Sequence, residues 1–150
     1  MKKSDELSES ILKEWLTVSS VIQNDRIVKD MPFNEALVCN HLMYSNDPGH
    51  LTLTQLCHLT GIRKSLMNRI LKSLIAKGLI VYADWDGDRR SKPVKLNPDR
   101  LDDFLDVHYH SVDVVKHLVE YWGMEKSAAI EQSLKDISGG FRHLYEEDGK

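Results

Sequence analysis

A run of basic and amide side chains between residues 63 and 72 is the part of the sequence best suited to binding another molecule. The run consists of Arg63, Lys64, Ser65, Asn68, Arg69 and Lys72. On a helix these positions share one face, and apolar residues at 67, 70, 71 and 74 occupy the other. In the major groove of DNA, Arg can donate two hydrogen bonds to guanine, and Asn pairs in the same bidentate way with adenine. The pattern therefore predicts a helix whose exposed face reads bases.

Different roles are expected along this face. Asn68 and Arg69 are the candidates for base reading, whereas Lys64 and Lys72 suit phosphate contacts. The first turn of such a helix is the part that enters the groove, which places residues 63–65 close to the bases. The alternative is a solvated helix face without a ligand.

A hairpin is predicted directly after this helix. Residues 79–82 and 93–96 have the composition of strands, and Asp86-Gly87 between them is a strong turn signal. Because Pro93 has no N–H to donate, the second strand should lie at the edge of its sheet. A hairpin in this place is a wing.

The wing carries a second basic group at residues 88–90. Arg89 or Arg90 could enter a minor groove or lie along the DNA backbone. Asp88 is expected to pair with Arg90 and to hold its guanidinium in place.

Capping signals frame the predicted helix on both sides. Thr52 and Gln55 form a capping box, Gly61 ends the short helix that they open, and Gly78 ends the next one. Two short helices separated by a tight turn have the layout of a helix-turn-helix. The hydroxyls of Thr52 and Thr54 could touch phosphate, although capping explains them equally well.

Amphipathic helices are predicted on both flanks. The first covers residues 7–28, and the second has Asn34 as its N-cap. After the hairpin, Asn97-Pro98 reads as the cap and first position of a long helix with an apolar stripe from residue 101 to 122. Gly123 interrupts that helix. A last helical stretch begins at residue 125, weakened by two glycines at 139 and 140.

Charge is distributed unevenly along the 150 residues. Residues 62–96 carry nine basic and three acidic side chains, a net charge of +6, which leaves −9 for the rest of a chain whose total is −3. A basic binding region on an acidic frame is the distribution expected of a nucleic-acid-binding protein. The composition, 41% apolar and 29% charged, is that of a globular domain and excludes disorder.

Several function classes have no support in the sequence. No apolar run is long enough to span a membrane, the N-terminus has no secretion signal, and the cysteines lack CxxC spacing, so a reduced cytoplasmic protein is expected. No enzyme or cofactor signature is present. The histidines at 108, 110 and 117 are not spaced as ligands on one helix face, which argues against a metal site. Cys39 and Cys57 fall on inward positions and favour packing over a redox switch.

Three stretches resemble the MarR (multiple-antibiotic-resistance regulator) family of bacterial transcription factors. Residues 51–56 look like the entry to the first reading helix, residues 61–65 and 74–80 like the recognition helix and its exit, and Asp88-Arg89-Arg90 with Lys92 and Leu96 like the wing signature. The sequence departs from the family where Arg63 replaces a capping Ser, where Trp85 and Gly87 replace an acid and an Arg, and where the Thr and Gly after the second wing strand are absent.

The resemblance implies a mainly α fold with a small β-hairpin, a winged helix-turn-helix at residues 34–96 and dimerisation helices at 1–31 and 98–150. It also implies a homodimer that binds a palindromic operator in double-stranded DNA, usually as a repressor. A small-molecule effector is a further partner, for which Trp15, Tyr121 and Trp122 could line a pocket, although aromatic residues at helical spacing more often belong to a core. The competing hypothesis is a winged-helix module that binds another protein without sequence-specific DNA binding.

Overall fold

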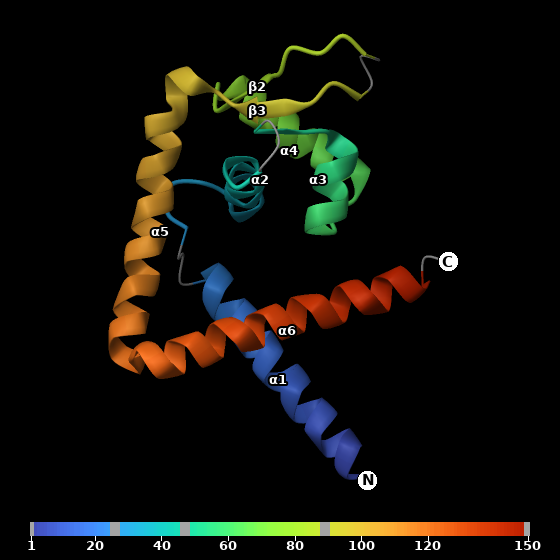
Figure 1. Cartoon of the computed structure of the whole chain (residues 1–150), viewed down its shortest axis with the longest axis vertical. Helices are drawn as coiled ribbons and strands as arrows, with labels where there is room; N and C mark the ends of the chain where they lie inside the picture. Colours follow the sequence, from blue (N-terminus) through green and yellow to red (C-terminus); the bar gives the residue numbers. More distant parts are fainter. Residues whose placement is uncertain (1, 25–27, 46–48, 88–90, 149–150) are drawn as a thin grey trace. The chain divides into compact units, whose positions relative to one another are not determined.

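The computed structural model describes residues 2–24, 28–45, 49–87 and 91–148. It is mainly helical with one small antiparallel sheet, which confirms the predicted fold class (Figure 1). In chain order the elements are α1 (Lys3–Asn24), α2 (Phe33–Met43), β1 (His50–Leu51), α3 (Leu53–Thr60), α4 (Lys64–Ala76), β2 (Ile80–Tyr82), β3 (Val94–Leu96), the short 3-10 helix η2 (Pro98–Arg100), α5 (Leu101–Trp122) and α6 (Met124–Asp148). The chain forms two compact units, Met1–Ser111 and Val112–Lys150, and no helix of the described segments is long and apolar enough to cross a membrane.

The predicted helix-turn-helix is formed by α3 and α4. The Thr52 hydroxyl accepts from the Gln55 N–H at 3.1 Å and the Gln55 side chain accepts from the Thr52 N–H at 2.8 Å, so the predicted capping box is confirmed. Gly61 ends α3 at a φ of +74°, a left-handed conformation that favours glycine. Only Ile62 and Arg63 separate Gly61 from the start of α4, and Arg63 occupies the N-cap position.

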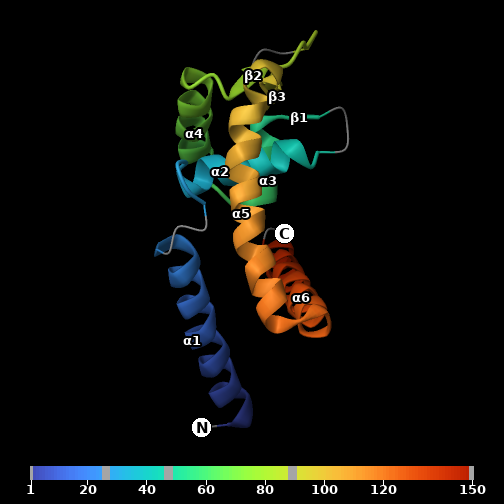
Figure 2. The same cartoon turned by 90° about the vertical axis from the view of Figure 1, so that its left-hand side faces the viewer.

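The first unit has one hydrophobic core, shared by α2, α3, α4, the sheet and the start of α5 (Figure 2). Its fully or nearly fully buried members are Val38, Cys39, Leu42, Leu56, Met67, Ile70, Leu71, Leu74, Leu79, Ile80, Val94 and Phe104. The four predicted inward positions of α4 are all among them. Since one face of α4 is buried in this core, its other face must point to solvent.

The sheet corrects one prediction from the sequence. Its order is β1-β3-β2, so β3 is the middle strand and not an edge. The two-residue strand β1 covers the side that Pro93 was expected to leave open, with His50 opposite Lys95. Pro93 does not break this ladder, because it precedes β3 and its carbonyl accepts from the Ala83 N–H at 2.9 Å.

The pairing of β2 with β3 confirms the predicted wing hairpin. The last ladder pair is Tyr82 with Val94, and the chain bends at Asp86 and Gly87. Residues 83–93 lie between the strands, so the connection is far longer than a two-residue turn. The described residues 83–87 of this connection lead away from the sheet (Figures 1 and 2).

Two helix boundaries differ from the predictions. α2 begins at Phe33 with Pro32 in the cap position, so Asn34 lies inside the helix and does not cap it. The fixed φ of proline already suits a helix start, and no side-chain cap is formed. α1 is described as far as Asn24, and Val28 lies outside a helix although the prediction reached it. In agreement with the prediction of a last helix only weakened by its two glycines, α6 continues through Gly139 and Gly140, because glycine lowers helix stability without forbidding a helix.

The flanking helices expose many large apolar side chains. On α1 these include Leu7, Ile11, Leu12, Leu16 and Val18, on α5 Val112, Val115 and Leu118, and on α6 Leu134, Ile137, Phe141 and Leu144. No residue of α1 is buried. Helices with apolar stripes are normally covered, so these exposed side chains are candidates for burial against another surface.

Candidate nucleic-acid interface

The exposed face of α4 is the centre of the candidate site. Lys64, Ser65, Asn68, Arg69 and Lys72 are all exposed on it, while Met67 and Leu74 are fully buried on the opposite side. These five positions fall within less than half of the helix circumference, because consecutive residues are about 100° apart. The structure thus places together all the polar residues that the sequence predicted for this helix.

The N-terminal end of α4 is electrostatically suited to an anion. Arg63 occupies the N-cap position without a side-chain hydrogen bond to the helix, and the first turn contains no acidic residue. The first N–H groups of a helix lack helical partners and carry a partial positive charge, to which Lys64 adds a full one. A phosphate, or a hydrogen-bond acceptor on a base, would therefore face N–H donors and positive charge at this end of the helix.

The two threonines at the start of α3 differ. Thr52 is half-buried, and its hydroxyl already accepts a hydrogen bond as part of the capping box. Thr54 is exposed on the first turn of α3. The cap therefore explains Thr52 structurally, and Thr54 is the more accessible of the two.

Lys77 takes no part in the exposed basic face, although it belongs to the basic segment of the sequence. Its ammonium group lies 2.7 Å from the carboxylate of Glu35 on α2, which also accepts from the Ser73 hydroxyl at 3.3 Å. Glu35 is the buried charged residue of the core, with 6% of its surface exposed. This ion pair fastens the C-terminal end of α4 to α2.

The described part of the wing carries aromatic and basic side chains. The Lys92 ammonium lies 5.3 Å from the centre of the Tyr82 ring, within range of a cation–π interaction. Trp85 packs its indole against Gly87, where a Cβ would lie 2.5 Å from the indole Nε1. A side chain at position 87 would therefore require the Trp85 indole to move. Asp88, Arg89 and Arg90 lie outside the described residues.

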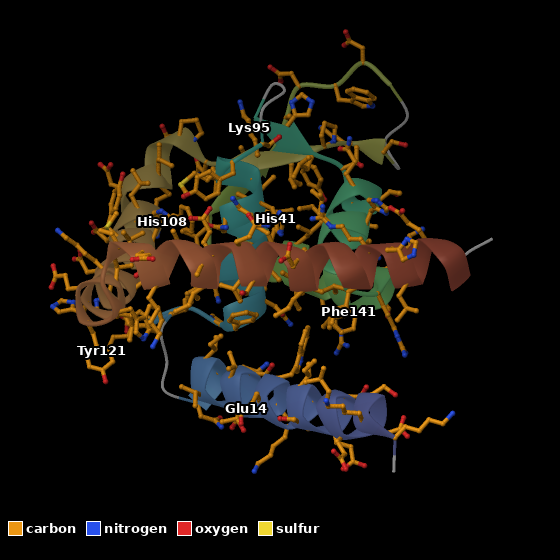
Figure 3. The ribbon with its side chains drawn as sticks, turned by 60° about the horizontal axis from the view of Figure 1, so that its bottom comes forward. Glu14, His41, Lys95, His108, Tyr121 and Phe141 are labelled. Carbon is orange, nitrogen blue, oxygen red and sulfur yellow. The ribbon has the colours of Figure 1, made fainter. Side chains whose placement is uncertain are left out.

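Two basic residues of the wing were not among the predicted contacts. Lys92 lies within the loop between the strands. Lys95 lies on the middle strand (Figure 3). Their charge was visible in the sequence, but a strand position does not say which face of the sheet reaches a ligand.

The cysteine and histidine side chains belong to elements other than α4. Burial, with the Glu35 carboxylate adding to it, raises the pKa of Cys39 to about 12, so this thiol is protonated at neutral pH and poorly reactive. Cys57 is half-buried at the edge of the same core. His108 on α5 packs against Phe104, and its Nε2 lies 3.4 Å from the Tyr44 hydroxyl oxygen. The described residues hold no group of three or more His, Cys, Asp or Glu side chains suited to a metal ion.

These features define a winged helix-turn-helix protein, and comparisons with known proteins show what it is similar to. Residues 29–91 match the sequence model of the MarR family, whereas no curated protein matches. Among solved structures, Sco3205, a MarR family transcriptional regulator from Streptomyces coelicolor in complex with DNA, has a TM-score of 0.73 at 18% identity, covering 94% of this chain and 93% of that one. Staphylococcus aureus MarR in complex with salicylate and kanamycin has a TM-score of 0.71 at 18% identity, covering 97% of both chains. AbsC, a MarR family transcriptional regulator from Streptomyces coelicolor, has a TM-score of 0.71 at 17% identity, covering 95% of this chain and 97% of that one. Residues 29–91 thus match the MarR family model, and the chain has the winged-helix fold of these solved structures.

Proposed function

We propose that this protein regulates transcription by binding double-stranded DNA sequence-specifically, as a homodimer on a palindromic operator, where it acts as a repressor. The observation that carries the proposal is the exposed face of α4, which gathers Lys64, Asn68, Arg69 and Lys72 on the solvent side of a helix whose other side is buried. The family match and the DNA complex of the similar protein Sco3205 support DNA-binding regulation.

Within this proposal the residues of the site have separate tasks. Asn68 and Arg69 read base edges, and Lys64 and Lys72 contact phosphate. Arg63 and Ser65 lie at the end of the helix that enters the groove. Thr52 and Thr54 are backbone-contact candidates from α3, and Asp88, Arg89 and Arg90 are the candidates from the wing.

The competing function is a module that docks another protein through the same fold. Such a module has no need for a helix face with three cations and no acidic residue among its exposed positions from 64 to 72. A protein-docking face is normally depleted in lysine at its centre. The composition of the face therefore favours DNA.

Selection of binding sites from random DNA, read at two salt concentrations, separates the two functions. DNA binding predicts an enriched palindrome whose affinity falls steeply with salt, because each phosphate contact releases counterions. Enrichment of no sequence by the dimeric protein would contradict the proposal and favour protein docking.

The roles within α4 can be tested by two matched variants. Arg69→Ala should relax the base preference at one position of the site, at a cost of about 1–3 kcal/mol for the preferred base. Lys72→Ala should weaken all sequences alike and reduce the salt slope by about 1. Equal shifts of specificity in both variants would show that the division into base and phosphate contacts is wrong.

The homodimer rests on the exposed apolar side chains of the flanking helices. On α5, Val115 and Leu118 are 46% and 37% exposed although they belong to its apolar stripe. A second copy of the chain brings the same stripes, and a two-fold axis would set two copies of α4 on successive turns of DNA. Leu118→Glu should convert a species of twice 17.3 kDa into a monomer in sedimentation, whereas Lys116→Glu, on the opposite face of α5, should not. A 17.3 kDa wild-type species at micromolar concentration would refute the dimer.

A small-molecule effector is the last part of the proposal. A hollow of about 180 Å³ lies between α2 and the start of α5, lined in part by Phe33, Leu37, Phe104 and His108. It is smaller than the roughly 300–1,000 Å³ of pockets for drug-sized ligands, so it suits a small, largely apolar molecule. Salicylate, found in the Staphylococcus aureus MarR structure, is a probe of this kind. It should raise the melting temperature of the wild type and not of Leu37→Trp, and an equal effect on both would exclude this hollow.

A further inference from the structure

The C-terminal end of α4 is held by residues that follow the wing in sequence. The last carbonyls of a helix have no partner within the helix. Here the Asn97 side-chain Nδ2 donates to the Gly78 carbonyl at 2.7 Å, and the Asn97 N–H donates to the Leu79 carbonyl at 2.9 Å. Arg100 Nη1 donates to the Lys77 carbonyl at 3.1 Å. Three consecutive carbonyls at the exit of α4 are thus bound by two residues at the entry of α5.

Asn97 uses both ends of its carboxamide. While Nδ2 binds the exit of α4, Oδ1 accepts from the Asp99 N–H at 3.1 Å and caps η2, which leads directly into α5. Serine and threonine cap helices as well as asparagine does, but a hydroxyl has a single heavy atom and is one bond shorter. The carboxamide therefore joins two helix ends at a position where a hydroxyl would serve only one.

Arg100 reinforces the same junction. Its Nε pairs with the Asp103 carboxylate on α5 while Nη1 reaches the exit of α4. Its guanidinium lies over Gly78, where a Cβ would be 3.3 Å from Nη1, and Gly78 has a φ of +74° that favours glycine. The positive charge also suits the negative end of the α4 dipole.

We propose that Asn97 and Arg100 are positioning residues that fix the recognition helix to the first turn of α5, so that a rotation of α5 is transmitted to the DNA-reading face. This inference rests on the proposed function. The leverage follows from length: 13 residues make α4 about 20 Å long, so a tilt of about 5° at its C-terminal end moves its first turn by about 2 Å. A displacement of that size breaks a bidentate base contact, whose hydrogen bonds tolerate only a few tenths of an ångström.

Two variants of Asn97 separate the junction from the cap. Asn97→Asp keeps the acceptor that caps η2 but replaces the donor by a carboxylate oxygen facing the Gly78 carbonyl. Asn97→Ser keeps a capping hydroxyl and adds no charge. The control is Asp102→Asn, an exposed acid in the first turn of α5. Each protein is measured as the full chain for its affinity for the DNA selected with the wild type, its salt slope, its melting temperature and the hydrogen exchange of amides 74–79.

Both Asn97 variants should raise the Kd about tenfold, the loss of one well-formed base contact, without changing the salt slope. Hydrogen exchange at residues 74–79 should become faster in both Asn97 variants. Asp102→Asn should leave the Kd and the exchange rates unchanged. Weaker binding by Asn97→Asp alone would be an effect of its charge and would overturn the inference, as would wild-type affinity in both variants. If the wild type selects no DNA, the proposed function fails, and the exchange measurement still decides whether Asn97 holds the end of α4.

Discussion

The ion pair between Glu35 and Lys77 leads to an asymmetric prediction. The Glu35 side chain is 8% exposed, whereas that of Lys77 is 47% exposed. Lys77→Ala would leave a buried carboxylate whose remaining side-chain contact among the described residues is the Ser73 hydroxyl at 3.3 Å. Glu35→Gln strands no charge, because Lys77 can turn to water and the amide oxygen still accepts. The lysine variant should therefore be the more damaging of the two.

The magnitude follows from the burial of the two partners. Removing one partner of a fully buried pair costs about 3–5 kcal/mol, and the half-exposed lysine indicates a smaller value of about 2–3 kcal/mol for Lys77→Ala. For a chain of this size that is a fall in melting temperature of roughly 4–12 °C. Glu35→Gln replaces a charged hydrogen bond by a neutral one and should cost about 1 kcal/mol or less.

Urea unfolding followed by circular dichroism measures these differences, at fixed protomer concentration because association shifts apparent stability. Lys72→Ala is the matched control, since it removes an exposed lysine from the same helix and should stay within about 0.5 kcal/mol of wild type. The salt slope of DNA binding should respond in the opposite way, falling for Lys72→Ala and staying constant for Lys77→Ala. A loss for Glu35→Gln equal to that for Lys77→Ala would refute the reasoning.

Three further predictions concern the cap of α3, the wing and the core thiol. Thr52→Ala should cost about 1 kcal/mol of stability in urea unfolding, with Thr54→Ala, which removes no cap, as its control; equal losses would contradict the capping role. With Trp15 and Trp122 changed to Phe, Gly87→Ala should displace the Trp85 indole and shift its fluorescence to longer wavelength, whereas Gly139→Ala, which meets open space, should leave it unchanged. The raised pKa of Cys39 means that the folded state favours the neutral thiol. The stability that this thiol contributes is therefore complete below its ordinary pKa of 9.0 and is lost as the pH rises toward 12. Between pH 8 and 10 the wild type should lose about 1.4 kcal/mol more than Cys39→Ala, and parallel losses would contradict this.

Local signals in the sequence correctly located the helix ends that frame the candidate site. The capping box at Thr52 and Gln55, the left-handed glycines Gly61 and Gly78, and the Asn97 cap are all found where they were predicted. These features are satisfied within a few residues of chain, so their physical requirements are visible in a short stretch of sequence. The two faces of α4 were equally accessible, because helical periodicity separates polar from apolar positions.

Contacts between distant residues were decided only by the tertiary structure. β1 has two residues, too few for any periodicity, and it exists because His50 and Leu51 pair with β3. That pairing made β3 the middle strand and overturned the edge position inferred from Pro93.

The same is true of the contacts that hold the recognition helix. A glutamate near the start of α2 reads as a solvent-exposed acid, yet packing buries Glu35 beneath Lys77. The sequence by itself determined a helix with one exposed basic face, since that face depends on spacing along one segment. What holds the helix in place, through Glu35 on one side and Asn97 and Arg100 on the other, depends on residues 19 to 42 positions away, which only the folded chain brings together.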